Sequence, residues 1–255
     1  MFETEVKLFI LFDILGDTVR SGMIQWKIER KRLEDIKNHI LDLILIAKIL
    51  ERYISDYVDI NKVIEYIIIH DLPEAITGDI TKFEGVSDEE IDRVNNLAIE
   101  YIIENFSHIM NFKELFDKYE SKADLESKVV KMIDKVHSAS TFIKYQAEKD
   151  IDMNKDGIMD SLRHHPFVEK RINEGYDLAD IFYEFHIKAV AFSDTELDKY
   201  GISRETADKI VFAIKGFADE LYKQKCNGSL FAIRDELPEN AMVYNKTLKE
   251  LRNFR

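Results

Sequence analysis

The sequence predicts an all-α protein that folds as one helical bundle. Gly and Pro, which interrupt helices, number only 9 and 3 among 255 residues. Hydrophobic residues make up 45% of the chain, which is enough for one large domain with a core or for two small ones. Because no internal repeat, low-complexity segment or clear linker divides the chain, we expect one domain over residues 1–225.

Apolar periodicity places the first helices. Residues 3–16 form a short predicted helix that ends at Gly16, and residues 17–34 are mixed in character. Residues 38–53 (NHILDLILIAKILERY) are apolar over four turns, too continuously for a helix at the surface. We therefore expect this segment at the centre of the bundle.

Two more helices are expected on either side of a turn. Residues 61–70 (NKVIEYIIIH) predict a second buried helix, after which Pro73 and Gly78 bend the chain. Residues 87–106 begin with a Ser N-cap and an acidic first turn, which together indicate a helix start.

The second half of the chain predicts a long amphipathic helix over residues 123–149 and later helices over 177–197 and 203–225. Residues 150–176 are interpreted as an insertion or a long connection. The tail, 226–255, has mixed character and stays unassigned. The expected architecture is a helical bundle with a C-terminal helical extension.

The net charge of −13 and the single cysteine narrow the function classes. An acidic surface repels phosphate backbones, so we expect no nucleic-acid polymer as a partner. Cys226 alone forms neither an internal disulfide nor a cysteine-based zinc site. The N-terminal MFETEVKLF does not look like a signal peptide, and no apolar run reaches about 18 residues. We therefore expect a cytoplasmic protein with no membrane partner.

A His-Asp pair, His70 and Asp71, ends the second apolar helix. An unpaired ionised carboxylate is costly to bury, so Asp71 needs a counter-charge, and a divalent metal ion is the strongest one available. Adjacent residues on a helix point about 100° apart, so this pair can flank one ion but cannot complete its shell. Other buried helices must supply the remaining ligands.

Two further candidate ligands lie on other predicted helices. His39 opens the apolar segment 38–53, and Asp134 lies on the inward stripe of the long helix. With His70 and Asp71 they would leave about two positions of a six-coordinate ion open for water or substrate. Open positions indicate catalysis rather than a structural metal site. Imidazole and carboxylate ligands suit one divalent ion among Mn, Co, Fe, Ni, Zn and Mg.

Three segments contain these candidates: HDLPEAITGD (70–79), RLEDIKNH (32–39) and IDK (133–135). Together they resemble the HD superfamily of metal-dependent phosphohydrolases, whose ligands follow the pattern H…HD…D. The first segment is similar to HD-x-x-E-x-x-T-G-D, a motif of the branch that contains bacterial 5′-deoxynucleotidases. The other two are similar to the R-x-E-x-V-x-x-H and final Asp-Lys of that branch. The resemblance runs over residues 20–145 and, more weakly, over 177–225, and it implies the helical HD-domain fold.

Glu74 and Asp79 are the candidate catalytic residues. Glu74 lies four residues after His70, where it could orient the attacking water or pass a proton to the leaving oxygen, and the resemblance implies the same role. Asp79 follows Thr77 and Gly78, and the resemblance implies that it lies near the sugar of the substrate or anchors the site. Thr77 is a candidate substrate contact, and the backbone at Gly78 can approach a ligand closely.

A substrate phosphate needs a cation in addition to the metal. The resemblance points first to Arg32, seven residues before His39, with Arg30 and Lys135 as weaker candidates. Trp26 lies about where the family places a tryptophan near the substrate, so it could stack on a base or pack against the sugar.

Three other features have plainer explanations than metal binding. His137 is expected to be a core histidine, with a second-metal ligand as the alternative. His164 and His165 look like part of a surface loop. DMNKDG (152–157) opens like a calcium-binding EF-hand loop, but Arg163 stands where the twelfth-position Glu should be. We therefore expect a connection between helices there.

The expected function is a metal-dependent phosphohydrolase that releases phosphate from a nucleotide, with a 5′-(deoxy)nucleoside monophosphate as the first choice. One alternative is an HD-fold hydrolase of a nucleoside triphosphate, an alarmone or a cyclic nucleotide. Others are an HD-fold di-iron oxygenase and a non-catalytic metal- or ligand-sensing helical module. The apolar stripes of the last two helices, which include Phe212 and Phe217, are expected to form core or the surface of a homodimer.

Overall fold

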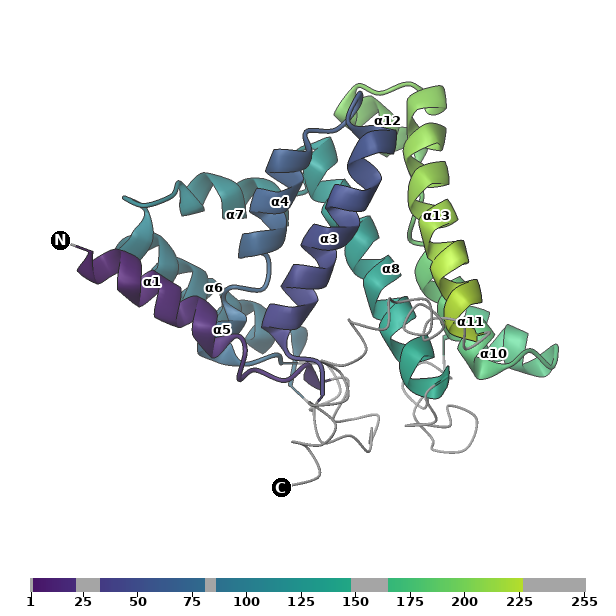
Figure 1. The fold of residues 1–255 in the computed structure, drawn as a ribbon, viewed down its shortest axis with the longest axis horizontal. Coiled ribbons are helices and arrows are strands. Elements are labelled where there is room, and N and C mark those ends of the chain that lie inside the picture. The colour runs from purple at the N-terminus through teal and green to yellow at the C-terminus, as the bar shows by residue number, and fades with distance from the viewer. Residues whose placement is uncertain (1, 22–32, 81–85, 148–164, 227–255) are drawn as a thin grey trace, which may run out of the picture.

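Every regular element that the computed structural model describes is a helix, which confirms the predicted all-α fold (Figure 1). The structure describes residues 2–21, 33–80, 86–147 and 165–226, so the EF-hand-like segment lies outside the described residues. The helices are α1 (Glu3–Ile14), α3 (Ile36–Ile54), α4 (Ile60–Ile69), α5 (Glu74–Thr77), α6 (Asp88–Phe106), α7 (Phe112–Glu120), α8 (Leu125–Ala147), α10 (Pro166–Asn173), α11 (Leu178–Ile187), α12 (Asp194–Tyr200) and α13 (Arg204–Cys226).

Helix α8 lies at the centre of the bundle. It contacts α3, α4, α11 and α13, and Figure 1 shows it between α3 on one side and α13 on the other. Its inward face carries Val129, Val130, Ile133 and Val136, none of them more than 1% exposed. Burial of one such side chain contributes about 1.5–3 kcal/mol, so this face holds the surrounding helices together. Asp134 follows Ile133 directly, which brings a carboxylate to the middle of the bundle.

Helices α3 and α4 pack on each other and on α8. Helix α3 begins after its N-cap residue Asp35, whose side chain accepts a hydrogen bond from the backbone N–H of Asn38 at 2.8 Å. Such a cap satisfies an N–H group that the first helical turn leaves unpaired. Helix α4 ends at Ile69, so His70 and Asp71 stand at the C-terminal end of a buried helix, as the sequence predicts.

The prediction of one helix over residues 177–197 is wrong, because two helices, α11 and α12, occupy this stretch. Ser193 starts the second helix with a capping box. Its hydroxyl accepts from the N–H of Glu196 at 3.3 Å, and the Glu196 carboxylate accepts from the N–H of Ser193 at 2.8 Å. This Ser-x-x-Glu spacing signals a helix start, and the apolar periodicity around it conceals the signal.

Helices α7 and α10, like the four-residue α5, lie where the sequence analysis expects none. Helix α7 begins after Asn111, whose side chain caps it. Helix α10 occupies part of the connection 150–176 and has Pro166 at its first position after the cap residue His165. Both are short, and each packs on a neighbour, α7 on α4 and α10 on α11. Short helices depend on such tertiary packing more than on their own propensity.

Among the described residues, no helix combines the length and the apolar character that a membrane span requires.

Leu43→Ala should lower the free energy of unfolding by about 2–5 kcal/mol, because Leu43 is 0% exposed on the inward face of α3. Leu45, in the same helix and 57% exposed, is the matched control, and Leu45→Ala should change this free energy by about 0.5 kcal/mol or less. Denaturant unfolding of the metal-free protein measures both. Equal losses from the two substitutions would contradict this assignment of the inward face.

Candidate metal centre

The structure brings the four predicted ligands to one place. His39 lies on α3, His70 and Asp71 follow α4, and Asp134 lies on α8, and these three helices pack on one another. The His39 side chain is 1% exposed and the two carboxylate side chains are 20% and 19% exposed. The four groups therefore meet at a largely buried point that solvent can still reach.

The distances among the donor atoms suit a single cation. His39 Nε2 lies 3.4 Å from Asp134 Oδ1 and 3.6 Å from Asp71 Oδ2, and His70 Nε2 lies 3.0 Å from Asp71 Oδ2. Two ligand atoms that are each about 2.1 Å from one ion, at angles of about 90–110°, are separated by roughly 3.0–3.4 Å. Donor atoms of His39, His70 and Asp71 all lie within 4.8 Å of one another.

The proton on His70 is placed so that its metal-facing nitrogen is free. Nδ1 lies 2.6 Å from the carbonyl oxygen of Ile67, and a carbonyl can only accept, so Nδ1 donates. Nε2 of the neutral ring then carries a lone pair. It is buried, and its neighbour at 3.0 Å, Asp71 Oδ2, is itself an acceptor, so no described residue donates to the lone pair. This is the arrangement in which a backbone acceptor orients an imidazole toward a metal. Burial lowers the pKa of His70, but the negative charge of Asp71 outweighs it and raises this pKa.

Three buried polar atoms near this point lack hydrogen-bond partners in the described part of the chain: His70 Nε2, Glu74 Oε2 and the Tyr119 hydroxyl. The Tyr119 ring lies edge-on to the His70 ring, with 6.0 Å between ring centroids. Buried polar atoms are normally paired, so a gathering of unpaired ones calls for an explanation. A cation with bound water would satisfy them, and the donor set fits such an ion.

The electrostatics of the centre favour a positive charge. Burial opposes the charge on Asp134, but the nearby imidazole of His39 and the charges of Lys135 and Arg20 outweigh it, so its pKa lies well below the usual range. Burial lowers the pKa of His39 to about 4, with help from the charge of Arg20. His39 is therefore neutral near pH 7, which is the form of imidazole that binds metals.

Glu74 has the opposite environment to Asp134. It starts α5 directly after Pro73, one turn beyond His70. Burial raises the pKa of Glu74 well above its usual range, and the negative charges of Asp71 and Asp79 raise it further. A carboxyl group with a raised pKa is better suited to general acid or base work than an ordinary one.

Arg20 is the cation of the site that the sequence analysis missed. Its Nη1 lies 2.8 Å from His39 Nδ1 and 3.1 Å from Glu34 Oε2, and its Nη2 donates to Ser138 Oγ at 3.3 Å. Backbone pairing brings it there, because the N–H of Arg20 donates to the carbonyl of Glu34 at 3.1 Å. The mixed segment 17–34 shows no local pattern that predicts this pairing.

The remaining predicted residues are placed as follows. The Asp79 carboxylate accepts from the backbone N–H of Ser21 at 2.6 Å, which ties it to the Arg20 segment. The Thr77 hydroxyl donates to the backbone carbonyl oxygens of Gly78 at 2.9 Å and of Pro73 at 3.3 Å. Gly78 adopts a φ of 73°, a backbone conformation in which a residue with a side chain would be strained. The chain turns at this residue and continues to Asp79.

Lys135 lies at the edge of the centre. Its Nζ is 3.7 Å from Asp134 Oδ2 and its side chain is 46% exposed. Trp26, Arg30 and Arg32 lie outside the described residues.

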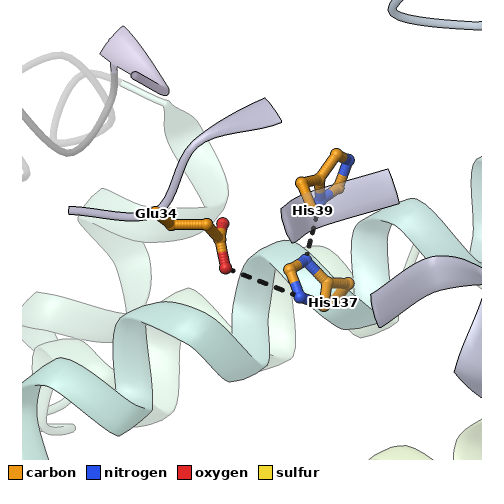
Figure 2. Close-up of side chains that lie close together, drawn as sticks. All are labelled: Glu34, His39 and His137. Carbon is orange, nitrogen blue, oxygen red and sulfur yellow. Dashed lines mark hydrogen bonds and ion pairs between the residues drawn. The ribbon is translucent and has the colours of Figure 1, made fainter. Parts of the chain in front are cut away.

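A second cluster of Glu34, His39 and His137 lies beside the first (Figure 2). His137 is 4% exposed, and its Nδ1 lies 2.9 Å from His39 Nδ1. The Arg20 guanidinium contacts both His39 Nδ1 and Glu34, so a positive charge already stands where a second ion would have to bind. We therefore interpret this cluster as a hydrogen-bonded network. His165, the other described candidate, caps α10 and is exposed.

A family model described as an HD domain matches residues 12–168. The chain belongs to the HD-domain family. The matched segment contains the four predicted ligands, which confirms the family resemblance. HD domains are metal-dependent, and this HD domain has a cluster of histidine and carboxylate donors that can hold an ion.

Several curated proteins are similar to this HD domain. "5′-deoxynucleotidase hdd1" of Schizosaccharomyces pombe is 27% identical over 168 residues, which are 63% of this chain and 82% of the relative. "5′-deoxynucleotidase YBR242W" of Saccharomyces cerevisiae is 29% identical over 136 residues, which are 51% of this chain and 55% of the relative. "5′-deoxynucleotidase HDDC2" of Homo sapiens is 24% identical over 117 residues, 45% of this chain and 55% of the relative. The chain thus spans about half the length of the last two.

Two solved structures share the fold of this HD domain. A "predicted metal-dependent phosphohydrolase" from Magnetospirillum magnetotacticum has a TM-score of 0.50 and 14% identity, over 88% of this chain and 94% of that chain. A conserved hypothetical protein from Pyrococcus furiosus has a TM-score of 0.50 and 21% identity, over 66% of this chain and 97% of that chain. At these identities the likeness shows the helical architecture alone.

A partly buried histidine near the centre, His186, is expected to make stability depend on pH. It lies on α11, its Nδ1 donates to the carbonyl of Phe182 at 2.9 Å, and its ring centroid is 4.1 Å from the Phe182 ring. Burial lowers the pKa of His186 to about 4. The folded protein therefore holds His186 neutral at a pH where the unfolded chain protonates it, and this difference favours unfolding in acid.

The free energy of unfolding should fall as pH drops from 6.5 toward 4, by about 1.4 kcal/mol per pH unit and about 3 kcal/mol in all from His186. His186→Phe should remove this contribution. The measurement is the difference in unfolding free energy between wild type and His186→Phe at pH 7, 6 and 5, since other titrating groups cancel. A difference that stays constant over this range would show that His186 is not held neutral.

Proposed function

We propose that this chain is a metal-dependent phosphohydrolase that releases phosphate from a nucleotide, with a 5′-(deoxy)nucleoside monophosphate as its substrate. The observation that carries this proposal is the convergence of two imidazoles and two carboxylates beside unpaired buried atoms, one of them on Glu74. The names of the relatives support a nucleotide substrate.

His39, His70, Asp71 and Asp134 are the proposed ligands of one divalent ion among Mn, Co, Fe, Ni, Zn and Mg. A bound ion of this kind supplies a water molecule of lowered pKa and neutralises a phosphate oxygen. The two carboxylates balance its charge, and the buried histidines contribute neutral nitrogens without further charge.

Glu74 is the proposed proton-transfer residue. Its raised pKa, caused first by burial, allows it to take a proton from water and to give one to the leaving sugar oxygen. Asp79 is proposed to act beside it. It holds the segment that carries Arg20 through its hydrogen bond with Ser21, and its negative charge helps to raise the pKa of Glu74.

Arg20 is the proposed cation for the substrate phosphate. It lies beside the ligand His39 and is largely buried, so its charge is little screened by solvent. Lys135 is a weaker proposed contact at the exposed edge. Thr77 stays a proposed substrate contact through its backbone, since its hydroxyl is used at the helix end. Arg32 and Trp26 stay proposals that lie outside the described residues.

Other substrates and roles are less well supported. A triphosphate or an alarmone needs several cations, and among the described residues the cations with a printed contact to a proposed ligand are Arg20, on His39, and Lys135, on Asp134. A purely sensing module would not need a buried carboxyl such as Glu74 next to the ligands. A di-iron oxygenase needs a second metal site, and Arg20 stands where the second cluster would hold it.

We also propose a cytoplasmic homodimer formed by one domain over residues 1–225. The buried cluster that supports a single domain includes residues from Leu11 to Ala218. A groove between α3 and α13 is lined in part by Ile49 and Phe212, and Phe212 is 79% exposed. A second copy would cover this apolar side chain, as exposed apolar patches commonly mark association surfaces.

Glu74→Gln and Asp134→Asn should separate chemistry from metal binding. Glu74→Gln removes the proton-transfer group and should lower kcat about 100-fold or more with little change in Mn²⁺ affinity. Asp134→Asn removes a ligand charge and should lower both kcat and the affinity for Mn²⁺. The measurements are phosphate release from nucleoside mono-, di- and triphosphates with several metals, and calorimetric titration with Mn²⁺.

Normal turnover by Glu74→Gln would remove Glu74 from its proposed role. Release of phosphate from triphosphates but not from monophosphates by the wild type would overturn the proposed substrate. Absence of metal binding by the wild type would overturn the proposed centre itself.

Arg20→Gln should lower kcat/KM for a monophosphate about 10- to 100-fold, mostly through KM, because a hydrogen bond to a charged group contributes about 1.5–3 kcal/mol. Lys135→Gln is the matched control at the exposed edge and should change kcat/KM about threefold or less. Steady-state kinetics of the metal-loaded enzyme measures both. A larger effect at Lys135 than at Arg20 would reverse this assignment.

A further inference from the structure

The two ring nitrogens of His39 face different partners. Nε2 faces the proposed metal centre, 3.4 Å from Asp134 Oδ1. Nδ1 faces the second cluster, 2.9 Å from His137 Nδ1 and 2.8 Å from Arg20 Nη1. A neutral imidazole has one proton, so the nitrogen that does not carry it is the one that can bind a metal.

Metal binding at Nε2 requires the proton of His39 to be on Nδ1. An N–H at that position needs an acceptor, and Arg20 cannot be one because a guanidinium only donates. His137 Nδ1, at 2.9 Å, can accept (Figure 2). His137 can therefore pair with the metal-binding tautomer of His39, which carries its proton on Nδ1. Arg20 can pair only with the other tautomer, which carries its proton on Nε2.

The surroundings of His137 decide which tautomer it adopts. Its Nε2 lies 3.2 Å from Asp42 Oδ2 and 3.7 Å from Glu34 Oε1. Ionised carboxylates only accept, so they draw the proton of His137 to Nε2. Nδ1 of His137 is then left with a lone pair that points at His39. In this arrangement His137 Nε2 donates to the carboxylates, and His39 Nδ1 donates to His137 Nδ1. The lone pair of His39 is then on Nε2, the nitrogen that faces the proposed metal centre.

The same order explains how Arg20 is held when His39 carries its proton on Nδ1. Two N–H groups cannot hydrogen-bond to each other, so Arg20 loses its acceptor on His39. It keeps Glu34 Oε2 at 3.1 Å and Ser138 Oγ at 3.3 Å as acceptors. The guanidinium thus stays in the site with part of its donor capacity free.

We propose that His137 is a positioning residue that sets the tautomer of His39 and so raises the affinity of this chain for its metal. This inference rests on the proposed metal centre and adds a residue that does not touch the ion. Groups that accept the second N–H of a ligand histidine change metal affinity by about 10- to 100-fold in other metal sites.

The test compares two substitutions of His137 by calorimetric titration with Mn²⁺ and Co²⁺ in the absence of substrate. His137→Leu removes the acceptor and should weaken metal binding about 10- to 100-fold. His137→Asn places a carbonyl oxygen near the position of Nδ1 and should bind metal within about threefold of the wild type. His186→Leu, which replaces a partly buried histidine with no described hydrogen bond or ion pair to a ligand, is the matched control and should leave affinity unchanged.

Two results would overturn the inference. One is equal metal affinity for His137→Leu and His186→Leu, which would make His137 a packing residue. The other is equal weakening by His137→Leu and His137→Asn, which would assign the loss to the ring rather than to the acceptor. Thermal unfolding of each metal-free variant shows that the protein compared is folded. If the wild type binds neither ion, the proposed metal centre fails and not only this inference.

Discussion

The structure depends on the compensation of two buried carboxylates. Asp71 and Asp134 come from different helices, and their side chains are about four-fifths covered, at 20% and 19% exposed. A buried negative charge is stable only beside positive charge or hydrogen-bond donors. Helices α3 and α4 and the segment before α3 supply these groups as His39, His70 and Arg20. The packing of the three helices therefore brings together both the buried carboxylates and the groups that stabilise their charge.

The neighbours of the centre alternate in charge and in hydrogen-bonding role. Arg20 stands between the carboxylate of Glu34 and the ring of His39, and His137 stands between His39 and two carboxylates. Each contact restricts which atom can carry a proton. In a site of low dielectric such restrictions are strong, because a wrongly placed proton leaves a buried group unpaired. The second cluster therefore supports the first.

Two carboxyl groups in one small volume have opposite properties. His39, Lys135 and Arg20 lie near Asp134 and lower its pKa despite its burial. Burial raises the pKa of Glu74, and the negative charges of Asp71 and Asp79 raise it further. Such a division assigns charge binding to one group and proton transfer to the other. It arises from the position of Glu74 after Pro73, where no described cation pairs with it.

Sequence alone determined the all-α fold and the pattern that points to the candidate ligands. These features follow from periodicity and fixed spacing, which are local properties of the chain. The apolar pattern overestimated the burial of residues 38–53, because one face of this helix, with Leu41, Leu45, Ile49 and Tyr53, is 41–62% exposed. Only the tertiary structure showed Arg20 and His137 at the centre. Arg20 reaches it through an antiparallel bridge between Val19 and Asp35, and His137 through the approach of α8 to α3. Both contacts join segments that are distant along the chain, and packing rather than local sequence decides which such segments meet.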